Sequence, residues 1–171
     1  SPEDILIIDG DIFDRGEKPV ELYFEILKYS NIYVIQGNHD VWVAREIGEK
    51  FAGEKVGQYI AYNTVSIMEK RLTPVDLLNL ADWIESKPFY INLELDGVKY
   101  QIAHAQTYLS PERLWDKSKI YMGDSHYTWF LQGLEEHDKF ISVVGHTTTD
   151  NRRIWTSPSG RTIRTDCGAG Y

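Results

Sequence analysis

Cysteine and long apolar runs are the two things this sequence most clearly lacks. The 171 residues contain a single cysteine, Cys167, which excludes an internal disulfide and favours a reducing, cytoplasmic location over a secreted one. No apolar run approaches the ~20 residues that a membrane-spanning helix needs, so we expect no membrane partner. The chain also has no low-complexity tract and no internal repeat.

Positive charge is scarce as well. The sequence has 18 Lys and Arg against 26 Asp and Glu, which gives a net charge of −8. A nucleic-acid-binding surface normally shows a basic patch, so we predict no nucleic-acid partner. An acidic protein that acts on an anionic substrate must instead concentrate positive charge locally, with a bound metal or a well-placed arginine.

What is present is enough apolar sequence for one folded domain. The chain is 42% hydrophobic and 26% charged, and its length allows it to bury a core. Residues 5–8 are four consecutive aliphatic residues, which predicts a strand buried on both faces in a parallel sheet. Residues 31–35 predict a second strand. Between them, residues 19–30 show helical spacing of apolar side chains, at Val20, Tyr23, Phe24 and Leu27.

Strand, helix and strand over about thirty residues predict a βαβ unit with a right-handed crossover. Both strands then end at the same sheet edge, where open α/β sheets bind ligands. Asp11, Asp14 and Arg15 follow the first strand, and Asn38 and His39 follow the second. Carboxylate, amide and imidazole groups together suit a metal site. The alternatives are an ordinary Asp-Gly turn and an internal salt bridge between Asp14 and Arg15.

The remaining sequence predicts a second set of elements. These are a helix over residues 41–52, a capped helix that starts at Thr73, a hairpin of residues 89–95 and 98–103, a strand over residues 140–144, and a second hairpin of residues 152–156 and 161–166. His104 and His146 each follow a predicted strand. A lone histidine in that place is more often structural than a ligand. The basic residues of 152–164 are either a substrate rim or a solvated face.

Four motifs occur in a fixed order: GDIFDRG at residues 10–16, GNHD at 37–40, AHA at 103–105 and GHT at 145–147. In this order they resemble the calcineurin-like metallophosphoesterases, and most of all the phosphoprotein (Ser/Thr) phosphatase branch that includes bacteriophage lambda phosphatase and bacterial relatives. The resemblance implies an α/β sandwich with mixed sheets flanked by helices, in a single domain over residues 1–171.

The resemblance also implies a centre of two divalent metal ions, with Mn expected and Fe or Zn as alternatives. Asp11 matches the carboxylate that bridges the two ions, and Asn38, His104 and His146 match the other ligands of the second ion. His39 matches the general acid, which Asp14 orients. Arg15 and Asn38 match groups that bind the substrate phosphate. The implied reaction is attack of a metal-bound hydroxide, with His39 protonating the leaving group.

Two features depart from the family pattern. No Asp-x-His, which supplies two ligands of the first metal, precedes Asp11. We therefore expect either a domain that is incomplete at both ends, without its first and last strands, or an altered metal site. The family usually carries a second phosphate-binding arginine between the two histidine motifs, whereas residues 114–117 offer Lys117.

We therefore predict a metal-dependent phosphomonoesterase of the Ser/Thr protein phosphatase type. Its partner is a phosphorylated protein or a small phosphoester, and its oligomeric state is open. One alternative is a hydrolase of diadenosine polyphosphates or nucleotides with the same core. The other is a catalytically silent binding module on the same fold.

Overall fold

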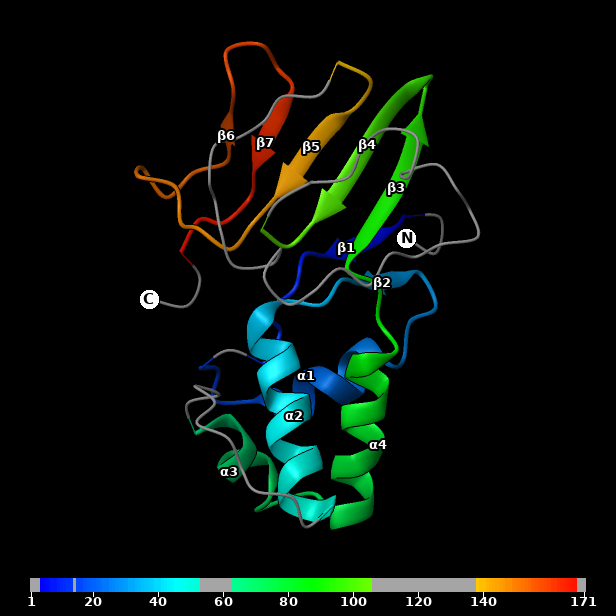
Figure 1. The fold of residues 1–171 in the computed structure, drawn as a ribbon, viewed down its shortest axis with the longest axis vertical. Helices are drawn as coiled ribbons and strands as arrows, with labels where there is room; N and C mark the ends of the chain where they lie inside the picture. Colours follow the sequence, from blue (N-terminus) through cyan, green and yellow to red (C-terminus); the bar gives the residue numbers. More distant parts are fainter. Residues whose placement is uncertain (1–3, 14, 53–62, 106–137, 169–171) are drawn as a thin grey trace. The chain divides into compact units, whose positions relative to one another are not determined.

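The computed structural model describes residues 4–13, 15–52, 63–105 and 138–168. It divides into two compact units, the first ending at Lys87 and the second beginning at Pro88. All four described helices lie in the first unit, and the second carries a five-stranded sheet (Figure 1). The predicted α/β class with mixed sheets and helices is confirmed. The assignment of the whole chain to one domain stays a prediction.

The first unit opens with the predicted βαβ arrangement. Strand β1 (Leu6–Ile8) pairs in parallel with β2 (Ile32–Val34), and helix α1 (Pro19–Ile26) connects them. The prediction that the first strand is buried on both faces is wrong, because Ile5 and Leu6 are more than half exposed. Within the described residues β1 has only β2 as a neighbour, so it is an edge strand.

Helix α1 is shorter than predicted and buries a different face. It ends at Ile26, four residues before the predicted end at Ser30. Its buried apolar side chains include Val20, Tyr23 and Ile26. Phe24 and Leu27, which were expected on the buried face, are about half exposed at 48% and 49%.

Three more helices complete the first unit: α2 (Asn38–Ala52), α3 (Thr64–Met68) and α4 (Pro74–Glu85). Helices α2 and α4 lie side by side (Figure 1). The predicted start of α4 is confirmed by a capping box, in which Thr73 and Asp76 exchange side-chain and backbone hydrogen bonds. The predicted apolar face of α4 is also confirmed as buried: Leu77, Leu80, Ala81 and Ile84.

The second unit is a mixed sheet of β3 (Tyr90–Leu95), β4 (Val98–Ala103), β5 (Ile141–Val144), β6 (Trp155–Thr156) and β7 (Thr162–Arg164), in the order β3-β4-β5-β7-β6. Both predicted hairpins are confirmed, the second with shorter strands. Asp96 and Gly97 have φ of 50° and 77°, as the tight primed turn of an Asp-Gly hairpin requires.

The central strands β4, β5 and β7 run parallel to one another. Their carboxyl ends therefore share one edge of the sheet, and the two histidines of the sequence motifs follow β4 and β5 at that edge. This parallel core positions the candidate site of the second unit.

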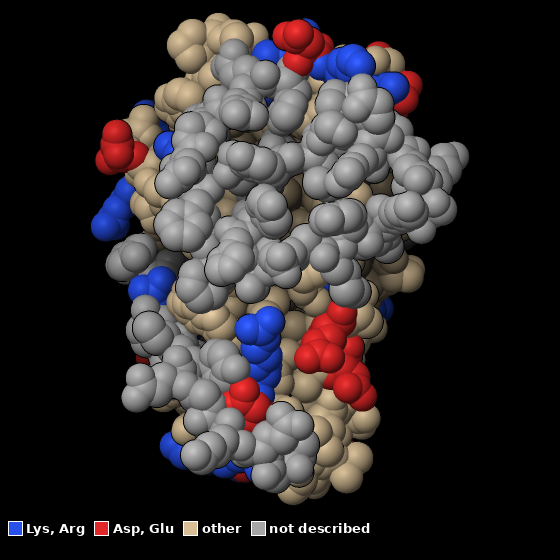
Figure 2. Space-filling view, viewed as in Figure 1, with Lys and Arg blue, Asp and Glu red and all other residues tan. Residues whose placement is uncertain are grey.

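Acidic and basic side chains of the described residues are interspersed on the face drawn in Figure 2. None of the helices within the described ranges is long and apolar enough to cross a bilayer. Two residues singled out in the sequence, Asp14 and Lys117, lie outside the described residues.

Replacing Leu80 with alanine is expected to lower the free energy of unfolding by about 2–5 kcal/mol, because Leu80 is fully buried in the core between the helices. Leu78→Ala on the same helix is the matched control, since Leu78 is 38% exposed. Urea unfolding followed by circular dichroism measures both variants. Equal losses would contradict the assigned core face of α4.

Candidate active site

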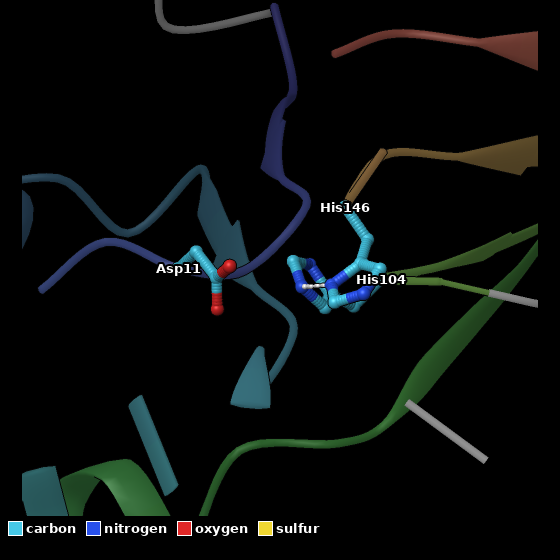
Figure 3. A group of neighbouring side chains, drawn as sticks. All are labelled: Asp11, His104 and His146. Carbon is cyan, nitrogen blue, oxygen red and sulfur yellow. Dashed lines mark hydrogen bonds between the residues drawn. The ribbon is translucent and has the colours of Figure 1, made fainter. Parts of the chain in front are cut away.

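The turn after β1 holds Asp11 in an unusual backbone conformation. Gly10 and Asp11 have φ of 82° and 54°, in the left-handed region that aspartate tolerates better than most residues. The Asp11 side chain, drawn in Figure 3, accepts a hydrogen bond at Oδ1 from the backbone N–H of His39 at 3.0 Å. The predicted meeting of the two polar clusters at one end of β1 and β2 is confirmed.

Gly37 is the residue that permits this close approach. A Cβ atom at position 37 would lie 2.1 Å from Asp11 Oδ1 and 2.3 Å from the Asp11 backbone nitrogen. Real side chains do not come that close, so any other residue would push the two turns apart. The glycine of the GNHD motif therefore serves to bring the Asp11 carboxylate against the start of α2.

Asp40 joins the same two turns through a second carboxylate. Its side chain is 1% exposed and accepts the N–H of Phe13 at 3.1 Å and the N–H of Gly37 at 3.0 Å. The Phe13 carbonyl in turn accepts a hydrogen bond from Thr64 Oγ1 at 3.0 Å. Sequence reasoning assigned Asp40 no role. The available signal was its place three residues after Gly37, where an acidic side chain commonly reaches back to cap a helix.

Asn38 and His39 lie in the first turn of α2, because the helix starts three residues earlier than predicted. Asn38 is 4% exposed, whereas His39 is half-buried. The His39 ring contacts Trp42 edge to face, with ring centroids 4.6 Å apart. A helix N-terminus stabilises nearby anionic groups by about 0.3–1 kcal/mol, which suits a phosphate site.

Arg15 lies in the segment after β1, a few residues beyond Asp11, and is partly buried. Its φ of 51° again lies in the left-handed region. Asp14, the predicted partner of His39, is outside the described residues, so its role stays a prediction.

In the second unit the structure brings His104 and His146 together. Ala103 at the end of β4 is the register partner of Val144 at the end of β5, and the N–H of Gly145 donates to the carbonyl of His104 at 2.8 Å. His104 Nε2 lies 3.1 Å from His146 Nδ1, and Figure 3 shows the two rings joined by a dashed line. His104 is 2% exposed.

This spacing fits two ligands of one metal ion. Ring nitrogens each about 2.0–2.1 Å from an ion and at right angles to one another would lie about 3 Å apart. His146 has φ of 63°, in the left-handed region that histidine adopts more readily than most residues. Imidazole nitrogens suit Mn, Fe and Zn. The two rings also form a hydrogen bond to each other at this distance, so their assignment as metal ligands stays a prediction.

The structure thus assembles the predicted residues in two groups. Asp11, Asn38 and His39 lie at the end of β1 and β2 in the first unit. His104 and His146 lie at the end of β4 and β5 in the second unit. Each group combines residues that follow the carboxyl ends of two neighbouring parallel strands.

Comparison with known protein families shows which family the chain belongs to. The model of the calcineurin-like phosphoesterases matches residues 1–166. The chain belongs to the calcineurin-like phosphoesterase family. Membership supports the predicted enzyme class, a phosphoric ester hydrolase, and the use of divalent metal ions.

The matching relatives carry the name of a sugar bisphosphatase, whereas the expected branch was that of the Ser/Thr protein phosphatases. The chain is 35% identical over 85 residues to a class 3 fructose-1,6-bisphosphatase of Bacillus velezensis, which covers 46% of the chain and 13% of the relative. It is 32% identical over 104 residues to an enzyme of the same name from Streptococcus agalactiae, which covers 54% of the chain and 16% of the relative. The chain therefore spans less than one fifth of the length of these relatives.

Gly37→Ala is expected to destabilise the first unit and to separate the two turns, because its Cβ would overlap Asp11. Gly48→Ala is the control: it lies inside α2, where an added Cβ would meet nothing within 4 Å, so it should stabilise by about 0.5–1 kcal/mol through helix propensity. Thermal unfolding of both variants provides the measurement. A stabilised Gly37→Ala variant would contradict the close approach.

Proposed function

We propose that this chain hydrolyses phosphate monoesters with the help of divalent metal ions. The observation that carries the proposal is the 3.1 Å spacing of the His104 and His146 ring nitrogens in a member of this family. In the proposed centre Asp11 supplies a bridging carboxylate, Asn38 supplies an amide oxygen, and the two histidines complete the ligand set.

The donor set of one carboxylate, one amide and two imidazoles suits Mn, with Fe or Zn as alternatives. Ions bound there would neutralise charge on the phosphoryl group and make water nucleophilic at neutral pH. The hydrogen bond from the His39 N–H to Asp11 Oδ1 supports the assignment, because it fixes the direction of the carboxylate.

The remaining residues bind the ester or assist the departure of its leaving group. His39 donates a proton to the leaving oxygen, and Asp14 holds its ring in the orientation for that transfer. Arg15 presents a planar set of N–H donors to the phosphoryl oxygens. The positive end of the α2 dipole also attracts the negatively charged phosphoryl group. Asn38 contacts the phosphate as well as the metal.

Two substrate classes follow from different observations. The order of the motifs resembles the Ser/Thr protein phosphatases, which favours a phosphorylated protein. The names of the relatives favour a small sugar phosphate. Comparison of kcat/KM on a phosphoserine peptide and fructose 1,6-bisphosphate, each with Mn²⁺, separates these two classes, and diadenosine tetraphosphate tests the nucleotide alternative. A cytoplasmic location remains a prediction from the single cysteine.

Asp11→Asn is expected to remove bound metal and activity together, because an amide lacks the charge needed between two cations. Plasma mass spectrometry on the dialysed protein and phosphate release measure the two properties. Asn tolerates the left-handed backbone at this position, so the fold should persist. Retention of the wild-type metal content in the variant would contradict the bridging role.

His39→Asn is expected to lower kcat by about 10²–10⁴-fold on an ester with a poor leaving group, the usual effect of removing a general acid. On a nitrophenyl phosphate, whose leaving group needs less protonation, the loss should be much smaller. Metal content serves as the control and should not change. The same loss on both esters would show that His39 has another role.

A further inference from the structure

A hollow of about 460 Å³ opens beside His146 within the second unit. It is lined by His146, Thr147, Thr148 and Arg152. The described lining therefore combines a predicted metal ligand, two hydroxyl-bearing residues and one guanidinium, and none of these four residues is acidic. Such a lining is suited to an anion.

Hydrogen bonds of the buried residue Thr149 hold the loop that carries Arg152. Thr149 is 4% exposed, and its N–H donates to the carbonyl of Asp166 at 3.0 Å. Its Oγ1 donates to the carbonyl of Arg153 at 2.7 Å and accepts the Arg153 N–H at 3.1 Å. The N–H of Arg152 donates to the Thr149 carbonyl at 2.9 Å. Thr149 therefore fixes the backbone of Arg152 relative to the end of β7.

Gly168 packs closely against the Thr148 methyl group and lies beside the Arg152 side chain. A Cβ at position 168 would lie 3.0 Å from Thr148 Cγ2 and 3.8 Å from Arg152 Nε. The Arg152 side chain thus runs past the glycine, next to Thr148, on the wall of the hollow. Gly168 has φ of 81°, which other residues rarely adopt. The neighbouring Arg153 is also exposed but does not line the hollow.

We propose that this hollow binds a second phosphate of a small substrate whose first phosphate is hydrolysed next to His146. The inference rests on the proposed function and deepens it. Arg152 supplies two N–H donors in a planar fork, and the hydroxyls of Thr147 and Thr148 supply single donors. Arg152 is then a specificity-determining residue that distinguishes bisphosphates from monophosphates, and it takes no part in the chemical step.

The test compares fructose 1,6-bisphosphate with fructose 6-phosphate in the presence of Mn²⁺, using the full chain and its Arg152→Gln and Arg153→Gln variants. Both variants lose one positive charge in the same loop, at a position that lines the hollow in one variant and does not in the other. Arg152→Gln should lower kcat/KM for the bisphosphate at least tenfold more than for the monophosphate, mainly through KM. Arg153→Gln should leave the ratio within about twofold of wild type.

Equal losses on both substrates in Arg152→Gln, or the same change of ratio in Arg153→Gln, would overturn the proposal. If the wild-type chain hydrolyses neither substrate, sugar phosphates are excluded as its substrates, and the proposed function fails only if the phosphoserine peptide and diadenosine tetraphosphate are not hydrolysed either. Calorimetric titration with pyrophosphate and with orthophosphate then decides the subsite by itself. The subsite is supported if Arg152→Gln, but not Arg153→Gln, binds pyrophosphate at least tenfold more weakly than wild type, with a smaller effect on orthophosphate. An unchanged affinity of Arg152→Gln for pyrophosphate overturns it.

Discussion

The buried carboxylate of Asp40 is the constraint on which the first half of the site depends. A carboxylate at 1% exposure is costly unless donors surround it, and here two backbone N–H groups from different turns serve that purpose. Loss of either hydrogen bond would leave the charge under-solvated, so the turns after β1 and β2 are held at a fixed separation. The position of Asp11 against the α2 N-terminus follows from that separation.

The second half of the site depends on strand register instead. His104 and His146 meet because Ala103 and Val144 are register partners on adjacent parallel strands. A shift of one residue in either strand would turn one histidine to the opposite face of the sheet. Hydrogen bonds at the strand ends, from Gly145 to His104 and from Thr165 to Val144, hold this register where the ligands lie.

Local signals in the sequence were sufficient for much of this structure. The Asp-Gly turn, the capping box at Thr73 and the apolar spacing of α4 each have a short-range physical cause, and all three are confirmed. The strand-helix-strand pattern also predicted that the polar clusters of Asp11 and His39 lie at one edge of the sheet. Predictions were wrong where long-range packing decides: the apolar residues of α1 fit two overlapping helical faces, and the neighbours of β1 cannot be read from β1 itself. The spacing of Asp40 from Gly37 indicated the capping bond, but its second partner, the Phe13 N–H, belongs to another turn and no sequence spacing reveals it.

Asp11, Arg15 and His146 share a left-handed backbone, at φ of 54°, 51° and 63°. For a residue with a Cβ this conformation costs roughly 1–2 kcal/mol, and aspartate, asparagine and histidine are among the residues that adopt it most readily. Alanine scanning at these positions would therefore combine two effects, the loss of a functional group and a change in backbone preference. Isosteric replacement at these three turns separates ligand chemistry from main-chain geometry, whereas truncation would exaggerate the apparent contribution of each side chain.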